Sequence, residues 1–185
     1  TLAFVGRFYD GVVPEGAVDE PFWQEVRKAE AEIRGLLEKV ELREAFRRLF
    51  ALSSIGNKKF QDGEPWKGVK ERPEATADLI WNLVYLVRDL AVLTSPFLPG
   101  TADRIARMLG VDRLGWADLG RLEGIGAIGR PELLFARLED PQVAALRERF
   151  SGTQASRRPL GKERGDAAGA PSAGLPTATS TAKPA

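Results

Sequence analysis

The sequence predicts an all-α protein, an antiparallel helical bundle followed by a disordered tail. Apolar residues recur at three- and four-residue steps in several segments, and no segment shows strand-like alternation over a useful length. After Ser151 the composition changes to Ala, Gly, Ser, Thr and Pro, with only Leu160 and Leu175 as large hydrophobes. Such a segment buries too little apolar surface to offset the entropy of ordering. We therefore expect a helical domain at residues 1–150 and a low-complexity basic tail or linker at residues 151–185.

The first third of the chain contains three helical patterns. Residues 1–11 have the pattern of the last turns of a helix. After a loop, Asp19 stands at an N-cap position, and an apolar stripe runs through residues 22–40. A third stripe covers residues 42–55, and we expect this helix to end at Gly56.

The stretch NKKFQDGEPWKG (57–68) is predicted to be a turn, and it carries Trp66. The longest apolar run begins at Pro73 and covers almost all faces of a helix, which places this helix at the centre of the bundle. The sequence SPFLPG (95–100) ends it. A short helix follows, and then an irregular glycine-rich region at residues 111–131.

Composition excludes several kinds of active site. The 185 residues include 27 Lys and Arg and 26 Asp and Glu, but no cysteine and no histidine. A thiol nucleophile, most hydrolytic triads and most zinc sites are therefore ruled out. We also expect no transmembrane helix and no signal segment. Since the chain begins at Thr1 and its only methionine is Met108, we expect an excised or processed piece of a longer protein.

Two further patterns have simpler explanations than a binding site. Glycines 124, 126 and 129 match the spacing of a dinucleotide-binding loop, but no strand precedes them, so we expect a closely packed loop. A group of carboxylates alternates with basic residues at helical spacing, which predicts a solvated face with ion pairs one helical turn apart. These carboxylates are Glu30, Glu32, Glu38, Glu41 and Glu44.

The region around Trp66 is basic. Residues 43–72 carry eight basic and four acidic side chains, a net charge of +4, around Phe60 and Trp66. Basic residues beside an aromatic side chain can contact phosphates and stack on a base of single-stranded nucleic acid. The alternative is that Trp66 folds back to cap the bundle, and composition alone slightly favours this alternative.

The order of motifs resembles the anticodon-binding helical domain of class I methionyl-tRNA synthetases, particularly the archaeal and related types. The resemblance covers about residues 1–140, and it is carried in order by FVGRFYDG, GNKKFQDGEPWK, the long apolar helix, LTSPFLPGTADRI and IGAIGRPELLFARLED. Isoleucyl, leucyl and valyl synthetases have similar helical domains, but the last motif makes the methionyl assignment more specific.

The resemblance implies roles for individual residues. In the family, the tryptophan of the PW turn stacks on an anticodon base of methionine tRNA, and that position is Trp66. Asn57 matches an asparagine that shapes the loop or lies near the anticodon. The family also uses an asparagine and an arginine that would precede Thr1. Phosphate-contact candidates, chosen from charge and position alone, are Lys58, Lys59, Lys67 and Lys70.

The resemblance also implies a larger enzyme, an ATP-dependent methionine–tRNA ligase. This chain has no HIGH-like or KMSKS-like motif, so we expect no catalytic, cofactor-binding or metal-binding residue in it. ATP with Mg²⁺ is implied for a separate catalytic domain, a partner in cis or in trans. We expect a cytoplasmic protein whose partner is the anticodon loop of methionine tRNA, without DNA or membrane partners.

Two other functions remain open at this point. The chain could be a helical protein-interaction module that uses Trp66 as its hydrophobic anchor. It could also be the anticodon domain of an isoleucyl, leucyl or valyl synthetase. RNA binding weakens steeply with salt, whereas an apolar protein interface does not, so salt dependence separates RNA binding from the protein-interaction alternative.

Overall fold

Seven α-helices and one 3-10 turn make up the regular structure of residues 1–150, the residues that the structure describes. In this computed structural model the elements are α1 (Leu2–Phe8), α2 (Glu20–Glu38), α3 (Leu42–Gly63), α4 (Pro65–Glu71), α5 (Pro73–Thr94), α6 (Pro99–Met108), η1 (Trp116–Asp118) and α7 (Asp140–Phe150). In this part of the chain the strand-like pairing is an isolated bridge between Val12 and Ala127. The predicted all-α helical bundle is confirmed; the predicted tail, residues 151–185, lies outside the described residues.

The chain divides into two compact units, Thr1–Ala136 and Arg137–Ala185. The first unit contains every element from α1 to η1. In the second unit the structure describes α7, an 11-residue helix without buried side chains. The domain boundary predicted at residue 150 stays a prediction.

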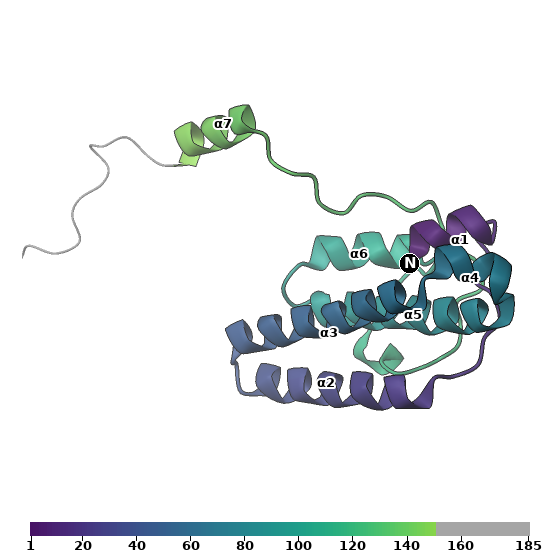
Figure 1. Cartoon of the computed structure of the whole chain (residues 1–185). Helices are drawn as coiled ribbons and strands as arrows, with labels where there is room; N and C mark the ends of the chain where they lie inside the picture. Colours follow the sequence, from purple (N-terminus) through teal and green to yellow (C-terminus); the bar gives the residue numbers. More distant parts are fainter. Residues whose placement is uncertain (151–185) are drawn as a thin grey trace, which may run out of the picture. The chain divides into compact units, whose positions relative to one another are not determined.

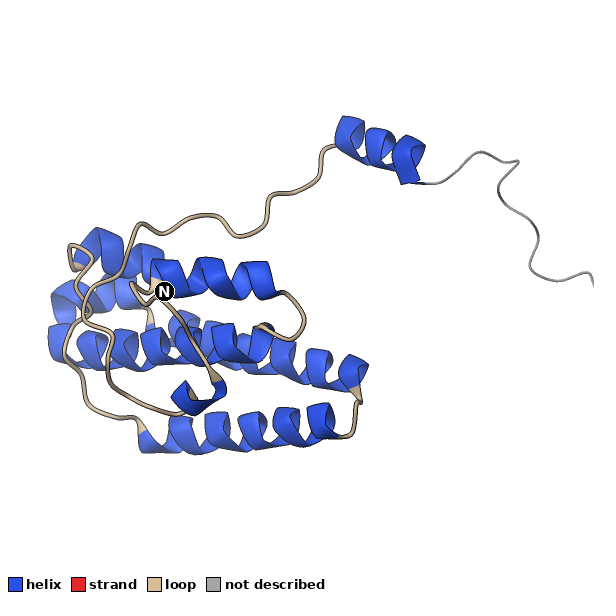
Figure 2. Cartoon of the chain, turned by 180° about the vertical axis from the view of Figure 1, so that it is seen from behind, coloured by secondary structure: helices blue, strands red, loops and turns tan. Residues whose placement is uncertain are grey.

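Helix α5 is the centre of the first unit. It contacts α2, α3, α4, α6 and η1, and Figures 1 and 2 show it inside the bundle, with α2 and α3 running side by side as an antiparallel pair. Its buried positions lie on several faces, as the apolar run predicts. Side chains that are at most 3% exposed on α5 include Ile80, Leu83, Val84, Tyr85, Leu86 and Leu93.

The start of α2 is fixed to α5 by polar contacts. Asp19 caps α2 as predicted, because its carboxylate accepts a hydrogen bond from Phe22 N at 3.1 Å. Asn82, which is 1% exposed, accepts from the Trp23 indole N–H at 2.7 Å and from Asp19 N at 3.1 Å. Its amide donates to the carbonyl oxygens of Ala17 and Asp78. All hydrogen-bonding groups of this buried amide are therefore used.

The predicted end of the third helix is wrong. Helix α3 does not stop at Gly56 but continues to Gly63, and the predicted turn at residues 57–68 is mostly helical. Gly56 lies inside the helix. A larger residue does not fit at this position, because a Cβ atom there would meet Leu86 Cδ2 at 2.3 Å. The glycine thus serves close packing of α3 on α5 rather than helix termination.

The predicted solvated carboxylate face is wrong for Glu30. This residue is 8% exposed and lies near Asp89 and Arg88 of α5. Burial, followed by the charge of Asp89, raises the pKa of Glu30 to about 8. Glu32 pairs with Arg48 of α3, an interhelical pair. The remaining three carboxylates, Glu38, Glu41 and Glu44, are exposed as predicted.

The predicted close packing of the glycine loop is confirmed at Gly129, where a Cβ atom would lie 2.8 Å from Arg107 O, but not at Gly124 and Gly126, which have open space around them. Backbone hydrogen bonds connect Val13 N to Gly126 O and Ile128 N to Gly11 O, both at 2.8 Å. Gly129 N donates to Met108 O at 2.9 Å. The loop therefore joins the end of α1 to the end of α6.

Candidate nucleic-acid interface

Trp66 lies at the corner between α3 and α4, in the first turn of α4. The corner forms because Glu64 takes a left-handed backbone, with φ 43° and ψ 54°, and Pro65 then starts the new helix. The Trp66 side chain is 43% exposed, whereas Pro65 is buried. Trp66 therefore does not plug the core, and the alternative of a buried cap does not describe its position.

A series of aromatic side chains supports Trp66 from behind. Its ring lies 6.1 Å from that of Phe60 on α3, and Phe60 in turn meets the ring of Phe4 on α1 edge-to-face at 5.9 Å. Phe4 also packs against Phe8 at 4.4 Å. Phe60 is thus the ring that packs beside Trp66, and Phe4 of α1 supports Phe60 in turn, while 43% of the Trp66 side chain stays exposed. A supported and accessible ring is suited to stacking on a planar ligand such as a base.

Helix α4 packs closely against the start of α5, and this packing fixes the orientation of Trp66. A Cβ atom at Gly68 would lie 2.4 Å from the hydroxyl oxygen of Thr76, so only glycine allows this approach. Both Gly68 and Thr76 are buried. The corner is thus a packed helical element rather than the turn that the sequence predicted.

Asn57 lies on the exposed surface of α3, one turn before Phe60. Together with Thr1 and Gln61 it lines a cavity of about 270 Å³. The amide is thus near the aromatic series but is not part of the buried packing. Its predicted role near the anticodon stays a prediction.

The four candidate lysines differ in their surroundings. Lys58 and Lys70 are exposed and form no ion pair within residues 1–150. Lys67 is exposed but paired with Glu64 at 2.7 Å. Lys59 is held between Asp19, 2.5 Å away, and the ring of Phe22 at 4.7 Å. This hydrogen bond from Lys59 is the main reason that the pKa of Asp19 is lowered.

The contacts of Lys59 turn it toward α2, so it differs from Lys58 and Lys70, whose ammonium groups are available to a ligand. A phosphate contact by Lys59 would compete with the Asp19 carboxylate, which also caps α2. Charge and sequence position alone do not distinguish Lys59 from the other candidate lysines, because its partner Asp19 is 40 residues away in the sequence.

Sequence reasoning missed the contribution of α1 to this corner. Phe4 and Phe8 extend the aromatic series, and the Arg7 guanidinium lies 5.3 Å from the Phe8 ring. The available signal was the sequence FVGRF, which combines two phenylalanines with a basic residue, Arg7. Nothing in it indicates that α1 meets Phe60, which lies 56 residues after Phe4 in the chain.

Between residues 1 and 150, no cluster of three or more Asp, Glu, His or Cys side chains is arranged to hold a metal ion. In the same range, no helix combines the length and apolar character needed to cross a membrane.

Comparisons with known proteins show the family of the chain. The profile of the family described as the anticodon binding domain of methionyl tRNA ligase matches residues 12–155. The methionine–tRNA ligase of Borreliella burgdorferi is 35% identical over 170 residues, which cover 88% of this chain and 23% of that protein. The corresponding protein of Treponema denticola is 33% identical, with 85% and 24% covered. The chain therefore spans less than a quarter of the length of these relatives.

The fold is also found in a solved structure. The crystal structure of the apo form of Mycobacterium tuberculosis methionyl-tRNA synthetase superposes with a TM-score of 0.68 at 22% identity, covering 76% of this chain and 30% of that one. At this identity the likeness concerns the fold. Since the family profile matches most of the chain, this protein belongs to the family of anticodon-binding domains of methionyl-tRNA ligases.

Proposed function

We propose that the chain binds the anticodon loop of a methionine tRNA at the α3–α4 corner, with Trp66 stacked on an anticodon base. The main support is the geometry of Trp66, an indole that is 43% exposed and backed by Phe60. Loop bases of RNA are recognised when they are splayed out onto aromatic side chains. One such stacking contact contributes about 1–3 kcal/mol.

The surrounding charge contributes affinity without sequence selection. Lys58 and Lys70 contact phosphates of the loop, since both ammonium groups are exposed and free of ion pairs within residues 1–150. Lys67 contributes less to phosphate binding, because the neighbouring Glu64 carboxylate already neutralises much of its charge. Lys59 acts mainly by holding α3 to the start of α2. Asn57 lies close enough to the aromatic series to contact the bound loop.

The longer protein is proposed to be a methionine–tRNA ligase. Its catalytic domain, in cis or in trans, uses ATP with Mg²⁺ to activate methionine, and the proposed location is the cytoplasm. No residue of this chain is proposed to hold ATP or Mg²⁺. The contribution of residues 1–150 is binding and orientation of the tRNA.

The proposal is tested by titrating a methionine tRNA anticodon stem-loop against the full chain at several salt concentrations. Binding that weakens steeply with salt is expected, because phosphate contacts release counterions. Stem-loops with isoleucine, leucine and valine anticodons serve as competitors. The proposal fails if no stem-loop binds, if affinity is independent of salt, or if another anticodon competes equally well.

A further inference from the structure

A second accessible aromatic side chain lies at the far end of the aromatic series that supports Trp66. Phe8, in the last turn of α1, is 37% exposed, and its ring packs on that of Phe4 at 4.4 Å. Phe4 is buried and meets Phe60, the ring beside Trp66. The series therefore has an accessible ring at each end, and the proposed function uses only one of them.

A neighbouring cation makes Phe8 different from an isolated phenylalanine on the surface. The Arg7 guanidinium lies over the Phe8 ring, 5.3 Å from its centre. Arg7 is exposed and takes part in none of the ion pairs found within residues 1–150. A guanidinium beside an aromatic ring offers planar surfaces for stacking a base and donors for a phosphate. We call Arg7 and Phe8 the α1 platform.

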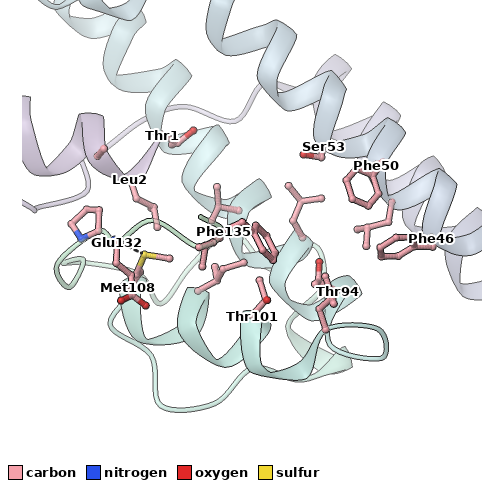
Figure 3. Close-up of a pocket in the computed structure, with 18 residues that line it drawn as sticks. Thr1, Leu2, Phe46, Phe50, Ser53, Thr94, Thr101, Met108, Glu132 and Phe135 are labelled. Atoms are coloured by element: carbon pink, nitrogen blue, oxygen red, sulfur yellow. Dashed lines mark hydrogen bonds between the residues drawn. The ribbon is translucent and has the colours of Figure 1, made fainter. Parts of the chain in front are cut away.

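Both ends of α1 are fixed to the bundle, so the α1 platform is a rigid surface. At the start of the helix, Leu2 is 8% exposed and points into a cavity of about 410 Å³ that α3 and α6 also line (Figure 3). After Phe8 the chain turns through Asp10 and Gly11, whose φ angles are 51° and 79°. Ile128 N then donates to Gly11 O at 2.8 Å. A rigid site loses little conformational freedom when a ligand binds.

The distance between the two accessible rings suits a single bound loop. Successive ring centres in the series are 6.1, 5.9 and 4.4 Å apart, so Trp66 and Phe8 are at most about 16 Å from each other. Stacked nucleotides rise about 3.4 Å each, so this distance corresponds to about five nucleotides or fewer. A loop with one base on Trp66 therefore has a second base within reach of Phe8.

We propose that the α1 platform stacks on a second base of the RNA loop bound at the α3–α4 corner, and that Arg7 also contacts a phosphate of that loop. This inference rests on the proposed function, because it concerns the same bound loop. The charge of Arg7 favours RNA over an apolar protein partner, since such a partner would bury the guanidinium without a counterion. Two bases of the loop, rather than one, then contribute stacking energy.

The first test measures the affinity of a methionine tRNA anticodon stem-loop for Phe8→Ala, beside Trp66→Ala and the unchanged chain. Loss of one stacking contact should raise Kd at least about 5-fold in Phe8→Ala. Phe8→Tyr keeps a ring and should bind as the unchanged chain does. Phe50→Ala is the matched control, because Phe50 is 59% exposed but lines the cavity of Figure 3, outside the aromatic series.

The second test uses stem-loops with an abasic site at one loop position at a time, which identify the base on the α1 platform. At one position the abasic stem-loop should bind Phe8→Ala and the unchanged chain equally, because the contact is already missing. That position should differ from the one found in the same way for Trp66→Ala.

A third measurement isolates the charge of Arg7. Arg7→Ala should reduce the slope of log K against log salt by about 0.7, because one phosphate contact is lost. Arg34→Ala should leave the slope unchanged, since Arg34 is also exposed but lies on α2.

The outcomes separate this inference from the proposed function. The inference alone fails if the stem-loop binds, Trp66→Ala weakens binding and Phe8→Ala does not. It also fails if Phe8→Ala and Phe50→Ala weaken binding equally. Dependence of Phe8 and Trp66 on the same loop position would contradict it too, because Phe8 would then only support the Trp66 ring. If no stem-loop binds the unchanged chain, the proposed function fails and this inference fails with it.

Discussion

Trp23 and Trp66 both lie in the first turn of a helix, yet their surroundings differ completely. Trp23 is fully buried, and its indole N–H is bound to Asn82. Trp66 is 43% exposed, and Phe60 supports it from one side. The seam between α2 and α5 is part of the packed core, whereas the α3–α4 corner leaves an aromatic side chain exposed, where we propose that RNA binds. Substitutions in the two regions should therefore affect different measurements.

The largest effect is expected for Trp23→Ala, which leaves a cavity in the core and should lower the free energy of unfolding by about 3–5 kcal/mol. Trp66→Ala should lower it by about 1 kcal/mol or less, because much of that side chain is already in water. Urea unfolding of both variants makes the comparison. Equal losses would show that Trp66 is part of the structural core.

Asn82→Ala tests the same seam through its hydrogen bonds. The variant leaves the Trp23 indole N–H and the Asp19 backbone N–H without their acceptor. We expect a loss of about 2–4 kcal/mol in the free energy of unfolding. Asn57→Ala is the control, because that amide is exposed on α3. If both variants unfold at the same urea concentration, the seam is not held by Asn82.

A third test measures how the free energy of unfolding depends on pH, because the carboxyl group of Glu30 is buried. Its pKa of about 8 in the folded protein lies above the ordinary value of 4.5, so the folded state binds more protons between these values. Stability should therefore fall as pH rises from about 5 to 8, by up to about 1.4 kcal/mol per pH unit.

Glu30→Gln should flatten this dependence, because the amide needs no proton. Glu38→Gln on the exposed face of α2 is the control and should leave the slope unchanged. The groups that face Glu30 are Asp89, Arg88 and Arg27. A slope that is the same in both variants would contradict the proposed effect of burial.

The smallest effects concern the exposed lysines of the corner. Lys58→Ala and Lys70→Ala should each weaken RNA binding a few-fold, and each should reduce the slope of log K against log salt by about 0.7. Neither should change the free energy of unfolding measurably. Lys28→Ala provides a comparison, since Lys28 is exposed on α2. If all three variants have the same salt slope, the corner is not where phosphates bind.

Hydrophobic periodicity was sufficient to predict the long helices, but it predicted neither α4 nor the end of α3. The central position of α5 followed from its apolar faces, and Asp19 was identified as a cap from its side chain. The end of α3 was misplaced because Gly56 looks like a stop signal. Its actual role depends on Leu86, which is 30 positions away and can be recognised only in the folded structure.

The site was only partly predictable for the same reason. A tryptophan among basic residues identified the corner, and local sequence is enough for that. The support from Phe4, the attachment of Lys59 to Asp19 and the burial of Glu30 all depend on contacts between distant segments. A single sequence carries charge and spacing, but it does not show which charges face a partner.

The most direct test of the account is the affinity of a methionine tRNA anticodon stem-loop for Trp66→Ala and Trp116→Ala, measured beside the unchanged chain at one salt concentration. Trp116 is the matched control, because it is 40% exposed but lies on η1, outside the corner. Loss of one stacking contact predicts a Kd about 5 to 150 times higher for Trp66→Ala and an unchanged Kd for Trp116→Ala. Equal affinities of Trp66→Ala and the unchanged chain would contradict the central claim.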